Sequence, residues 1–379
     1  MASNGRDRVL VVLSLNGGND ILNSLVPYTN GQYYDYRPNV NIPQEQVLPI
    51  NDELGYHPAM TEFKSLYDQG NAAIIQGVGY PHPSLSHFRS MDIWHTCEPD
   101  KIGTEGWLGR AIRDLDPNSE NVLTGVNFGR GLPRAMVAQG VPVASVGDLA
   151  TYGVLTPIEG EAQRAQALEV FSRMYSPAIG SGPVMDYIWG TGRSALKGAD
   201  ILKEVPRKYS STVEYGDDAV GQGMKSIAQV HLANLGTRVL YTASPFNSFD
   251  NHSNQAGDHS RMWTNVSRAV DDFYADLREH GLGEEVLLLV FSEFGRRARD
   301  NGSGTDHGTG GLCWVVGDHV AGGMYGEYPS LKPSELEDGN LRHTVDFRSV
   351  YATMLEQWLG LDSKPIIGGS YEHLNFMKN

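Results

Sequence analysis

The chain has 379 residues, of which 40% are hydrophobic and 20% are charged, and its formal net charge is −15. This length allows either one α/β domain with an insertion or two domains. The acidic balance disfavours nucleic acid as a partner, because negative charge repels the phosphate backbone, and no apolar run is long enough for a membrane helix.

Short apolar runs rich in β-branched residues recur along the chain, bounded by Gly, Pro and Asn. Because these runs do not alternate polar with apolar residues, they predict strands that are buried on both faces of a parallel sheet. In chain order, the predicted strands are residues 9–15, 72–78, 238–242, 286–291 and 312–316.

Helical patterns separate several of the predicted strands. They cover residues 59–67, 266–278 and 347–359. Asp346 is placed to cap the start of the last helix and Gly360 to end it. Strands that alternate with helices predict an α/β fold with a mostly parallel central sheet covered by helices on both faces.

The segment of residues 149–236 carries weak strand signals and has a mainly helical pattern, clearest at residues 161–175 and 184–202. We interpret it as a helical insertion or lid over the sheet. The expected organisation is therefore a single α/β domain over residues 1–379 with this insertion.

The N-terminus and the cysteines leave the cellular compartment open. Residues 1–8 lead directly into the first predicted strand without the apolar segment of a signal peptide, so we expect either a cytosolic protein or one whose leader was removed. Cys97 and Cys313 are too few for a disulfide framework or a cysteine-based zinc site. We expect two buried free thiols, with a single disulfide as the alternative.

Polar residues follow four of the predicted strands. Ligands of open α/β sheets bind outside the carboxyl ends of the strands, so these residues predict a site at that edge. The polar clusters are Asn16-Gly17-Gly18-Asn19-Asp20, Ser84-Leu85-Ser86-His87-Phe88-Arg89, Phe249-Asp250-Asn251-His252, Ser292-Glu293-Phe294-Gly295-Arg296-Arg297 and Gly304-Thr305-Asp306-His307-Gly308.

Five residues of these clusters are candidate metal ligands: Asp20, Asp250, His252, Asp306 and His307. Mixed Asp and His ligation suits Zn²⁺ or Mn²⁺ better than Mg²⁺ or Ca²⁺. Alternatively, Asp20 caps the following helix and His252 is an ordinary hydrogen-bond partner. His307 is placed to act as a ligand or as an acid–base group.

Ser86 stands where a helix is expected to begin, so the helix N-terminus would attract an anionic group and a metal could activate the hydroxyl as a nucleophile. Serine is also a common helix start, and Ser84 is a second choice for the nucleophile. Arg89, one turn further along, is placed either to hold an anionic oxygen or to pair with Asp92.

Glu293 follows a strongly buried predicted strand, where a carboxylate needs a metal or a cationic partner. The alternative to a role in the site is an ion pair with Arg296 or Arg297. Arg296 itself is a candidate to stabilise charge that develops during a reaction.

Several enzyme classes are excluded by missing motifs. The chain has no Gly-x-Ser-x-Gly elbow, which disfavours an ordinary α/β-hydrolase esterase. It has no P-loop, no Gly-x-Gly-x-x-Gly after the first predicted strand, and no His-Glu-x-x-His helix. These absences disfavour nucleotide enzymes, dinucleotide enzymes and zinc peptidases.

Taken in order, the polar clusters resemble the motif series of a bacterial family, the domain-of-unknown-function group DUF1501. The strings are Leu15-Asn16-Gly17-Gly18-Asn19-Asp20, Ser86-His87-Phe88-Arg89-Ser90-Met91-Asp92, Phe249-Asp250-Asn251-His252, Ser292-Glu293-Phe294-Gly295-Arg296, Thr305-Asp306-His307-Gly308 and Asp346-Phe347-Arg348-Ser349-Val350-Tyr351. The resemblance runs from about residue 8 to about residue 361.

The resemblance implies an alkaline-phosphatase-like or sulfatase-like three-layer α/β/α sandwich with a metal-centred hydrolytic site. It also implies export to the periplasm, because family members often carry a twin-arginine leader. By position, Asp20 resembles the first-strand metal ligand of that superfamily, and Ser86 lies in the region of its nucleophile. The Asp250 and His252 pair and His307 resemble its later ligands.

Two departures from the superfamily pattern affect the expected chemistry. The chain has Ser292-Glu293 where the superfamily usually has Asp-His, which puts a full two-metal site in doubt. Residues 79–89 also lack the Cys/Ser-x-Pro-x-Arg string that sulfatases use to build their modified nucleophile.

Residues and resemblance together predict a metal-dependent hydrolase that cleaves a phosphate or sulfate ester of a small molecule or carbohydrate. In this hypothesis the divalent metal polarises the ester, and Ser86 or an activated water attacks it. The alternative is a non-catalytic protein that binds an anion or sugar on a decayed hydrolase scaffold. Metal-assisted chemistry on another bond also stays open, as does the oligomeric state.

Overall fold

The computed structural model describes residues 6–149, 160–174 and 182–378. In these residues, nine strands form one central sheet. They are β1 (Val9–Ser14), β5 (Ala72–Gly79), β6 (Gly125–Phe128), β7 (Val143–Val146), β8 (Val239–Ala243), β9 (Val286–Phe291), β12 (Gly311–Val316), β13 (Gly323–Tyr325) and β14 (Val345–Asp346). Eight of them follow the order β13-β5-β12-β9-β1-β8-β6-β7, and β14 pairs with the end of β5.

The central sheet is mostly parallel. β12 runs antiparallel to its two neighbours β5 and β9. The other pairings among the described strands of this sheet are parallel. The predicted sheet is confirmed, and the ends of the five predicted strands lie within one residue of the observed ends.

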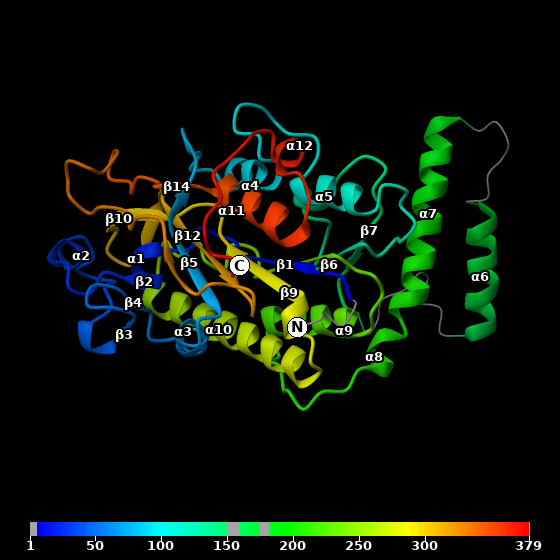
Figure 1. The fold of residues 1–379 in the computed structure, drawn as a ribbon, viewed down its shortest axis with the longest axis horizontal. Coiled ribbons are helices and arrows are strands. Elements are labelled where there is room, and N and C mark those ends of the chain that lie inside the picture. The colour runs from blue at the N-terminus through cyan, green and yellow to red at the C-terminus, as the bar shows by residue number, and fades with distance from the viewer. Residues whose placement is uncertain (1–5, 150–159, 175–181, 379) are drawn as a thin grey trace.

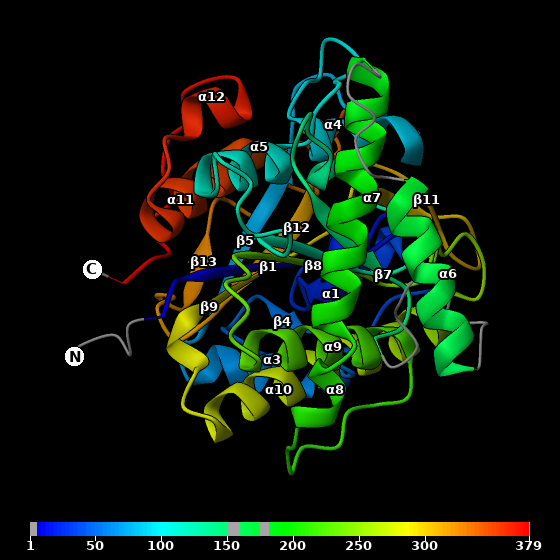
Figure 2. The same ribbon diagram turned by 90° about the vertical axis from the view of Figure 1, so that its right-hand side faces the viewer.

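Helices cover both faces of the sheet, as Figures 1 and 2 show. One face carries α3 (Thr61–Asp68), α9 (Ala219–Leu232) and α10 (Gln255–Glu279). The other face carries α4 (His87–Thr96), α5 (Trp107–Leu115), α11 (Phe347–Thr353) and α12 (Ser363–Ile367). The predicted three-layer α/β/α sandwich is therefore confirmed.

The first strand shows why its sequence is apolar from Val9 to Leu13. Val11 of β1 packs in the core between the sheet and α10, and Trp263 of α10 belongs to the same core. Its neighbour Val12 packs in the core on the α4 side, which includes Trp94. Successive strand residues face opposite layers, so a strand between two helical layers needs apolar residues at every position. Each fully buried valine or leucine contributes about 1.5–3 kcal/mol.

Two of the predicted helices differ from their observed form, one in its starting residue and the other in its last turn. The predicted helix at residues 266–278 is the second half of α10, which begins at Gln255. Gln255 and His259 are buried polar residues in the first half, so they interrupt the apolar periodicity of the helix. At the other helix, Asp346 accepts a hydrogen bond from the Arg348 amide, confirming the predicted cap. That helix continues into a π-helical turn, Met354–Leu359, and ends at left-handed Gly360.

The predicted helical segment contains α6 (Glu161–Met174), α7 (Pro183–Leu202) and α8 (Val205–Lys208). The helices α6 and α7 lie beyond the β7 edge of the sheet, whereas α8 lies beside α9 (Figure 1). Residues 150–159 and 175–181 of this segment lie outside the described residues. α9 belongs to the sandwich, because it packs against β8. The single domain and the lid remain predictions.

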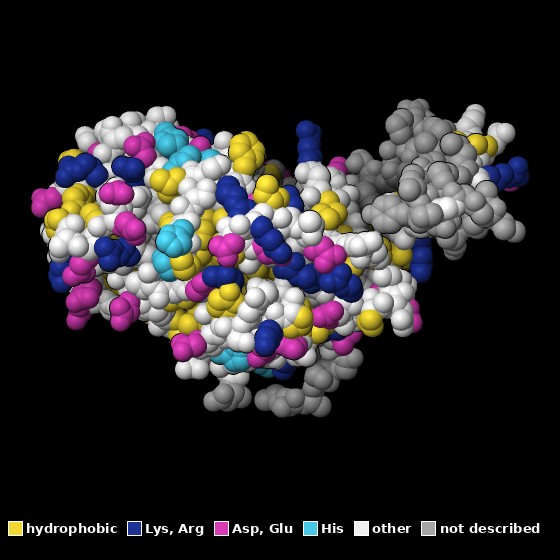
Figure 3. Space-filling view, turned by 90° about the horizontal axis from the view of Figure 1, so that it is seen from above, with side chains coloured by type: hydrophobic (Ala, Val, Ile, Leu, Met, Phe, Trp, Pro, Cys, Tyr) yellow, Lys and Arg dark blue, Asp and Glu magenta, His cyan; other side chains and the backbone are white. Residues whose placement is uncertain are grey.

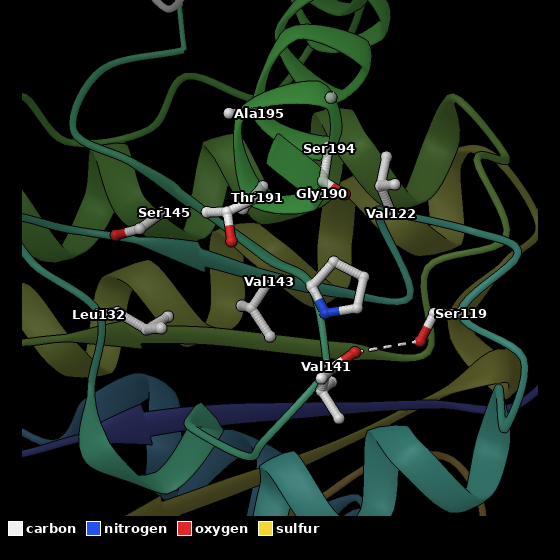
Figure 4. Close-up of a pocket in the computed structure, with 14 residues that line it drawn as sticks. Ser119, Val122, Leu132, Val141, Val143, Ser145, Gly190, Thr191, Ser194 and Ala195 are labelled. Carbon is white, nitrogen blue, oxygen red and sulfur yellow. Dashed lines mark hydrogen bonds between the residues drawn. The ribbon is translucent and has the colours of Figure 1, made fainter. Parts of the chain in front are cut away.

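A cavity of about 460 Å³ separates α7 from β7 (Figure 4). Its lining is mainly small and apolar, with Val143 from β7 and Gly190 and Ala195 from α7. None of the residues predicted to form the site lines this cavity.

Smaller elements complete the described chain. A hairpin of β10 (Arg296–Asp300) and β11 (Thr305–His307) follows β9. A three-stranded sheet and two short helices follow β1 and contribute to the same end of the molecule. They are α1 (Ile21–Ser24), β2 (Leu25–Val26), α2 (Gly31–Tyr36), β3 (Leu48–Pro49) and β4 (Gly55–Tyr56). Short 3₁₀ turns lie at Gln44–Gln46, Arg134–Met136 and Gly283–Glu285.

Both cysteines are buried and free, as predicted. Burial raises the pKa of the Cys97 thiol to about 12, so this thiol is unreactive near neutral pH. None of the described helices is both long and apolar enough to cross a membrane.

Four histidines in the core predict acid sensitivity. Burial lowers the pKa of His57, His95 and His231 to about 4 and that of His259 to about 3. The unfolded chain binds these protons near pH 6.5, whereas the folded chain does not. The free energy of unfolding therefore falls as the pH drops from about 6.5 towards 4, by up to ~1.4 kcal/mol per pH unit for each histidine.

Urea denaturation between pH 7.5 and 4.5 tests this expectation with His95→Gln, because His95 is buried on α4. The free energy of unfolding of the variant is expected to fall less steeply as the pH drops. The difference in slope is up to the contribution of one histidine, ~1.4 kcal/mol per pH unit. The partly exposed His373 supplies the control His373→Gln. An unchanged slope in His95→Gln would contradict the prediction.

Candidate metal centre

A cluster of imidazole and carboxylate groups lies where three parts of the chain meet at the carboxyl end of the sheet. His87 is the first residue of α4, Asp250 lies in the loop after β8, and His307 ends β11. One potential ligand atom from each lies within 4.8 Å of the other two. In Figure 3, which views the face of α4 and α5, histidine side chains are exposed beside hydrophobic ones.

The glycine pair after β1 allows this close approach. Gly17 has a φ of 121°, and a Cβ at this position would lie 2.4 Å from the backbone nitrogen of Asp250. The Gly17 amide also donates to Glu293 Oε1 at 2.9 Å. A side chain at Gly17 would therefore displace the loop that carries Asp250, which explains why the sequence has a glycine here.

The orientation of His87 is set by Glu293. Nδ1 of His87 lies 2.8 Å from Glu293 Oε1, and since an ionised carboxylate only accepts, Nδ1 carries the proton. In the neutral imidazole, Nε2 is then a lone-pair acceptor. It is buried without a hydrogen-bond partner among the described residues, 3.4 Å from Asp250 Oδ2. Burial opposes the charged form, but the Glu293 carboxylate outweighs it and raises the pKa of His87.

His307 has the same arrangement with a backbone partner. Its Nδ1 donates to the Leu85 carbonyl at 2.8 Å, so Nε2 is again the acceptor. This Nε2 lies 3.1 Å from Asp250 Oδ1 and 2.9 Å from Nε2 of His252. Burial lowers the pKa of His307, which favours the neutral imidazole.

His252 stands on the outer side of the cluster with 44% of its side chain exposed. Its Nδ1 lies 3.2 Å from Asp306 Oδ1, which leaves Nε2 as the acceptor, 3.1 Å from Asp250 Oδ1. Hydrogen bonding to Asn301 and His252 outweighs the burial of the Asp306 carboxyl and lowers its pKa.

In their neutral forms, the three imidazoles thus direct lone pairs towards one carboxylate. Lone pairs that meet at 2.9 Å repel each other unless a proton or a cation lies between them. Zinc binds imidazole nitrogen at about 2.0–2.1 Å. A ligating histidine commonly donates its other N–H to a carboxylate, as His87 does to Glu293. The side chains that fit a divalent cation are therefore His87, Asp250 and His307, with His252 as a fourth.

Arg296 fixes Asp250 rather than facing a substrate. Arg296 is 1% exposed, and its Nη2 donates to Asp250 Oδ1 at 2.8 Å. It also donates to the carbonyl groups of Gly18, Thr305 and Phe249. Burial of Asp250 is offset by this guanidinium, which lowers the pKa of Asp250 and keeps it ionised.

Asp20 lies outside the cluster and its oxygens are occupied. Arg37 donates to both of them, at 2.5 Å and 2.9 Å. Gln255 donates to Oδ2 at 2.6 Å, and the Leu22 amide donates to Oδ1. The alternative for Asp20, a helix cap, is the one observed, and no oxygen of this 2% exposed side chain is left for a metal.

Of the three remaining predicted residues, Arg89 follows the alternative given for it, whereas Ser86 and Glu293 lie beside the cluster. Arg89 pairs with Asp92 at 2.6 Å, which was the alternative to a role in the site. Ser86 is exposed at the N-cap position of α4, directly before His87, and its hydroxyl does not cap the helix. Glu293 pairs with His87, so the alternative for Glu293, an ion pair with Arg296 or Arg297, is not the one observed.

His87 is the residue that sequence reasoning missed as a ligand candidate. The signal was present, since His87 follows Ser86 in a cluster at a predicted strand end. The serine hydroxyl and the expected helix N-terminus favoured the neighbouring residue, Ser86, instead. Glu293 provides a second signal, because a buried carboxylate after a strand needs a hydrogen-bond donor or cation from elsewhere in the chain.

Fold and site define an α/β/α sandwich protein with a candidate metal centre at the carboxyl ends of its strands. The chain belongs to the family described as "Protein of unknown function (DUF1501)", whose model matches residues 157–372. The matched region contains Asp250, Glu293 and His307, whereas His87 precedes it. The predicted family is confirmed. No curated protein matches the sequence.

Three solved structures are similar to this chain at low sequence identity. The PsFucS1 sulfatase from Pseudoalteromonas sp. has 13% identity and a TM-score of 0.46, over 98% of this chain and 71% of that chain. A protein in the alkaline phosphatase superfamily from Vibrio parahaemolyticus has 8% identity and a TM-score of 0.42, over 97% and 70%. The lipoteichoic acid synthase LtaP from Listeria monocytogenes has 7% identity and a TM-score of 0.41, over 96% and 75%.

Proposed function

We propose that the protein is a metal-dependent hydrolase that cleaves a phosphate or sulfate ester at the cluster of His87, Asp250 and His307. The observation that supports it is the convergence of imidazole nitrogens on the Asp250 carboxylate. In His87 and His307, Nδ1 forms a hydrogen bond that fixes the orientation of the ring. The opposite nitrogen, Nε2, is thereby directed towards the candidate metal position.

The donor set favours particular metals. Imidazole nitrogen suits Zn²⁺ and Mn²⁺, whereas Mg²⁺ and Ca²⁺ prefer oxygen ligands. A bound cation of this kind polarises an ester oxygen and lowers the pKa of water. Glu293 and the Leu85 carbonyl orient the ligands, and Arg296 keeps Asp250 anionic.

Two exposed groups beside the cluster have suitable chemistry for the reacting ester. Ser86 offers a free hydroxyl at the N-terminus of the ten-residue helix α4, where backbone N–H groups attract anions. His252 is 44% exposed and is oriented by Asp306, so its Nε2 is placed either to complete the metal site or to hold a proton. We assign the nucleophile to Ser86 or to water.

Metal content is the first test. The purified protein is incubated with Zn²⁺ or Mn²⁺, passed through a desalting column and analysed by elemental mass spectrometry. We expect close to one metal ion per chain, and a loss of most of it in His87→Ala and His307→Ala. His373→Ala, which removes a histidine paired with Glu356 elsewhere on the surface, is the matched control. A chain that retains no metal under any of these conditions would refute the proposed centre.

Turnover then separates the hydrolase from its alternative, a non-catalytic anion-binding or sugar-binding protein. The alternative is favoured by Ser292-Glu293, which stands where the superfamily usually has Asp-His. The Glu293 carboxylate accepts hydrogen bonds from His87, Gly17 and Ser292. Release of nitrophenol from 4-nitrophenyl phosphate or sulfate by the metal-loaded protein, lost in Asp250→Ala, would support the hydrolase. Stoichiometric metal without turnover of either ester would favour the binding protein.

A further inference from the structure

A cavity of about 410 Å³ adjoins the candidate metal centre and shares His87 and Glu293 with it. Two phenylalanines line this cavity, Phe88 and Phe246, with 81% and 74% of their surface exposed. Six large hydrophobic side chains are exposed in the described part of the chain, and the two aromatic ones among them both lie here. Their exposure is therefore concentrated at the site.

Both rings are carried by the segments that carry the candidate ligands. Phe88 follows His87 in the first turn of α4. Phe246 lies in the loop after β8, four residues before Asp250. Asn247, next to Phe246, has a left-handed backbone with a φ of 55°, which turns the chain at this point. The position of each ring is thus tied to the position of a ligand.

The cavity is larger than a tetrahedral oxyanion requires. It adjoins a second cavity of about 910 Å³, because Asn16, His95 and Phe246 line both cavities. The polar residues Asn247 and Arg134 also line the first cavity. Such a wall offers apolar ring faces and a few polar groups, which is typical of sites for organic molecules.

We propose that Phe88 and Phe246 select the leaving group of the substrate, and that this group carries a ring. The ring packs against the two exposed phenylalanines while the anionic group meets the metal centre, which removes apolar surface from water. This inference deepens the proposed function and rests on it. Phe88 and Phe246 are specificity-determining residues in this proposal.

Binding of phosphonates tests the proposal without turnover. Isothermal titration compares phenylphosphonate with methylphosphonate on the zinc-loaded protein. We expect phenylphosphonate to bind about tenfold more tightly, because the ring buries apolar surface that a methyl group does not. The preference is expected to fall to about threefold or less in Phe88→Ala/Phe246→Ala, with the metal content unchanged. Cyclohexylphosphonate distinguishes stacking of an aromatic ring from packing of a saturated one.

Ile102→Ala is the matched control, since Ile102 is 73% exposed and does not line the cavity. It should keep the full preference for phenylphosphonate. The single variant Phe246→Ala serves if Phe88→Ala disturbs the adjacent His87. Equal binding of the two phosphonates by the parent, absence of binding, or a preference that survives in the double variant would overturn the proposal. A preference that persists in protein without metal would support the ring site while the proposed metal centre fails.

Discussion

The substitution Arg37→Met is expected to lower the free energy of unfolding by about 3–5 kcal/mol. Arg37 and Asp20 are 0% and 2% exposed and form a two-point ion pair at 2.5 Å and 2.9 Å. Loss of the guanidinium leaves a buried carboxylate whose remaining partners, such as Gln255, carry no charge. A desolvated charge without a counter-charge is among the costliest defects in a core. Urea denaturation measures the loss.

The same pair connects distant parts of the site, which gives the prediction a second readout. Arg37 donates to the Ala298 carbonyl of β10, and Gln255 joins Asp20 to the hydroxyl of Thr305 on β11. This hairpin carries His307 at its end. Arg37→Met is therefore expected to weaken metal retention as well as stability.

Two further variants make the Arg37 experiment decisive. Lys64→Met breaks an exposed pair with Asp68, one turn apart on α3, and is expected to cost about 0–1 kcal/mol. Arg37→Met/Asp20→Leu removes both buried charges and is expected to recover much of the loss of the single variant. A loss below about 1 kcal/mol in Arg37→Met would show that the pair contributes little beyond an exposed one.

The layers of the fold could be predicted from local sequence because burial on both faces leaves a local pattern. An uninterrupted apolar run such as β9 (Val286–Phe291) is buried at all six positions. Such a run needs no knowledge of its partners to be recognised as a central strand. The antiparallel direction of β12 could not be predicted, because it depends on the β10–β11 hairpin that connects it to β9.

The site was predictable in position but only partly in composition. Asp250, His252 and His307 were predicted ligands, and the structure brings them together. Asp20 was predicted as well, but Arg37 holds it, and nothing near Arg37 in the sequence marks it as a buried partner. Pairing across the fold, such as His87 with Glu293, depends on distances that local patterns do not contain.

Glu293→Gln is expected to weaken metal binding about 10- to 100-fold, because partners that orient a ligating histidine contribute this much to affinity. Glu293 is 2% exposed and accepts from Gly17, Ser292 and Nδ1 of His87. A glutamine carbonyl can still accept from the Gly17 amide, so the loop after β1 keeps its hydrogen bond. The amide carries no charge, however, so it no longer strengthens the basicity of His87. Competition with a chromophoric zinc chelator measures the dissociation constant.

A comparison of stabilities distinguishes a Glu293 that positions His87 for metal binding from a Glu293 that only supports the fold. Zinc that binds the folded chain alone stabilises it in proportion to the logarithm of its affinity, so a 10- to 100-fold loss removes about 1.4–2.7 kcal/mol of the gain that zinc provides. Glu356→Gln, which alters a carboxylate 2.8 Å from the surface residue His373, should leave that gain intact. If Glu293→Gln lowered the stability of the metal-free protein while keeping the full gain from zinc, Glu293 would be a structural residue and His87 would not require it for binding.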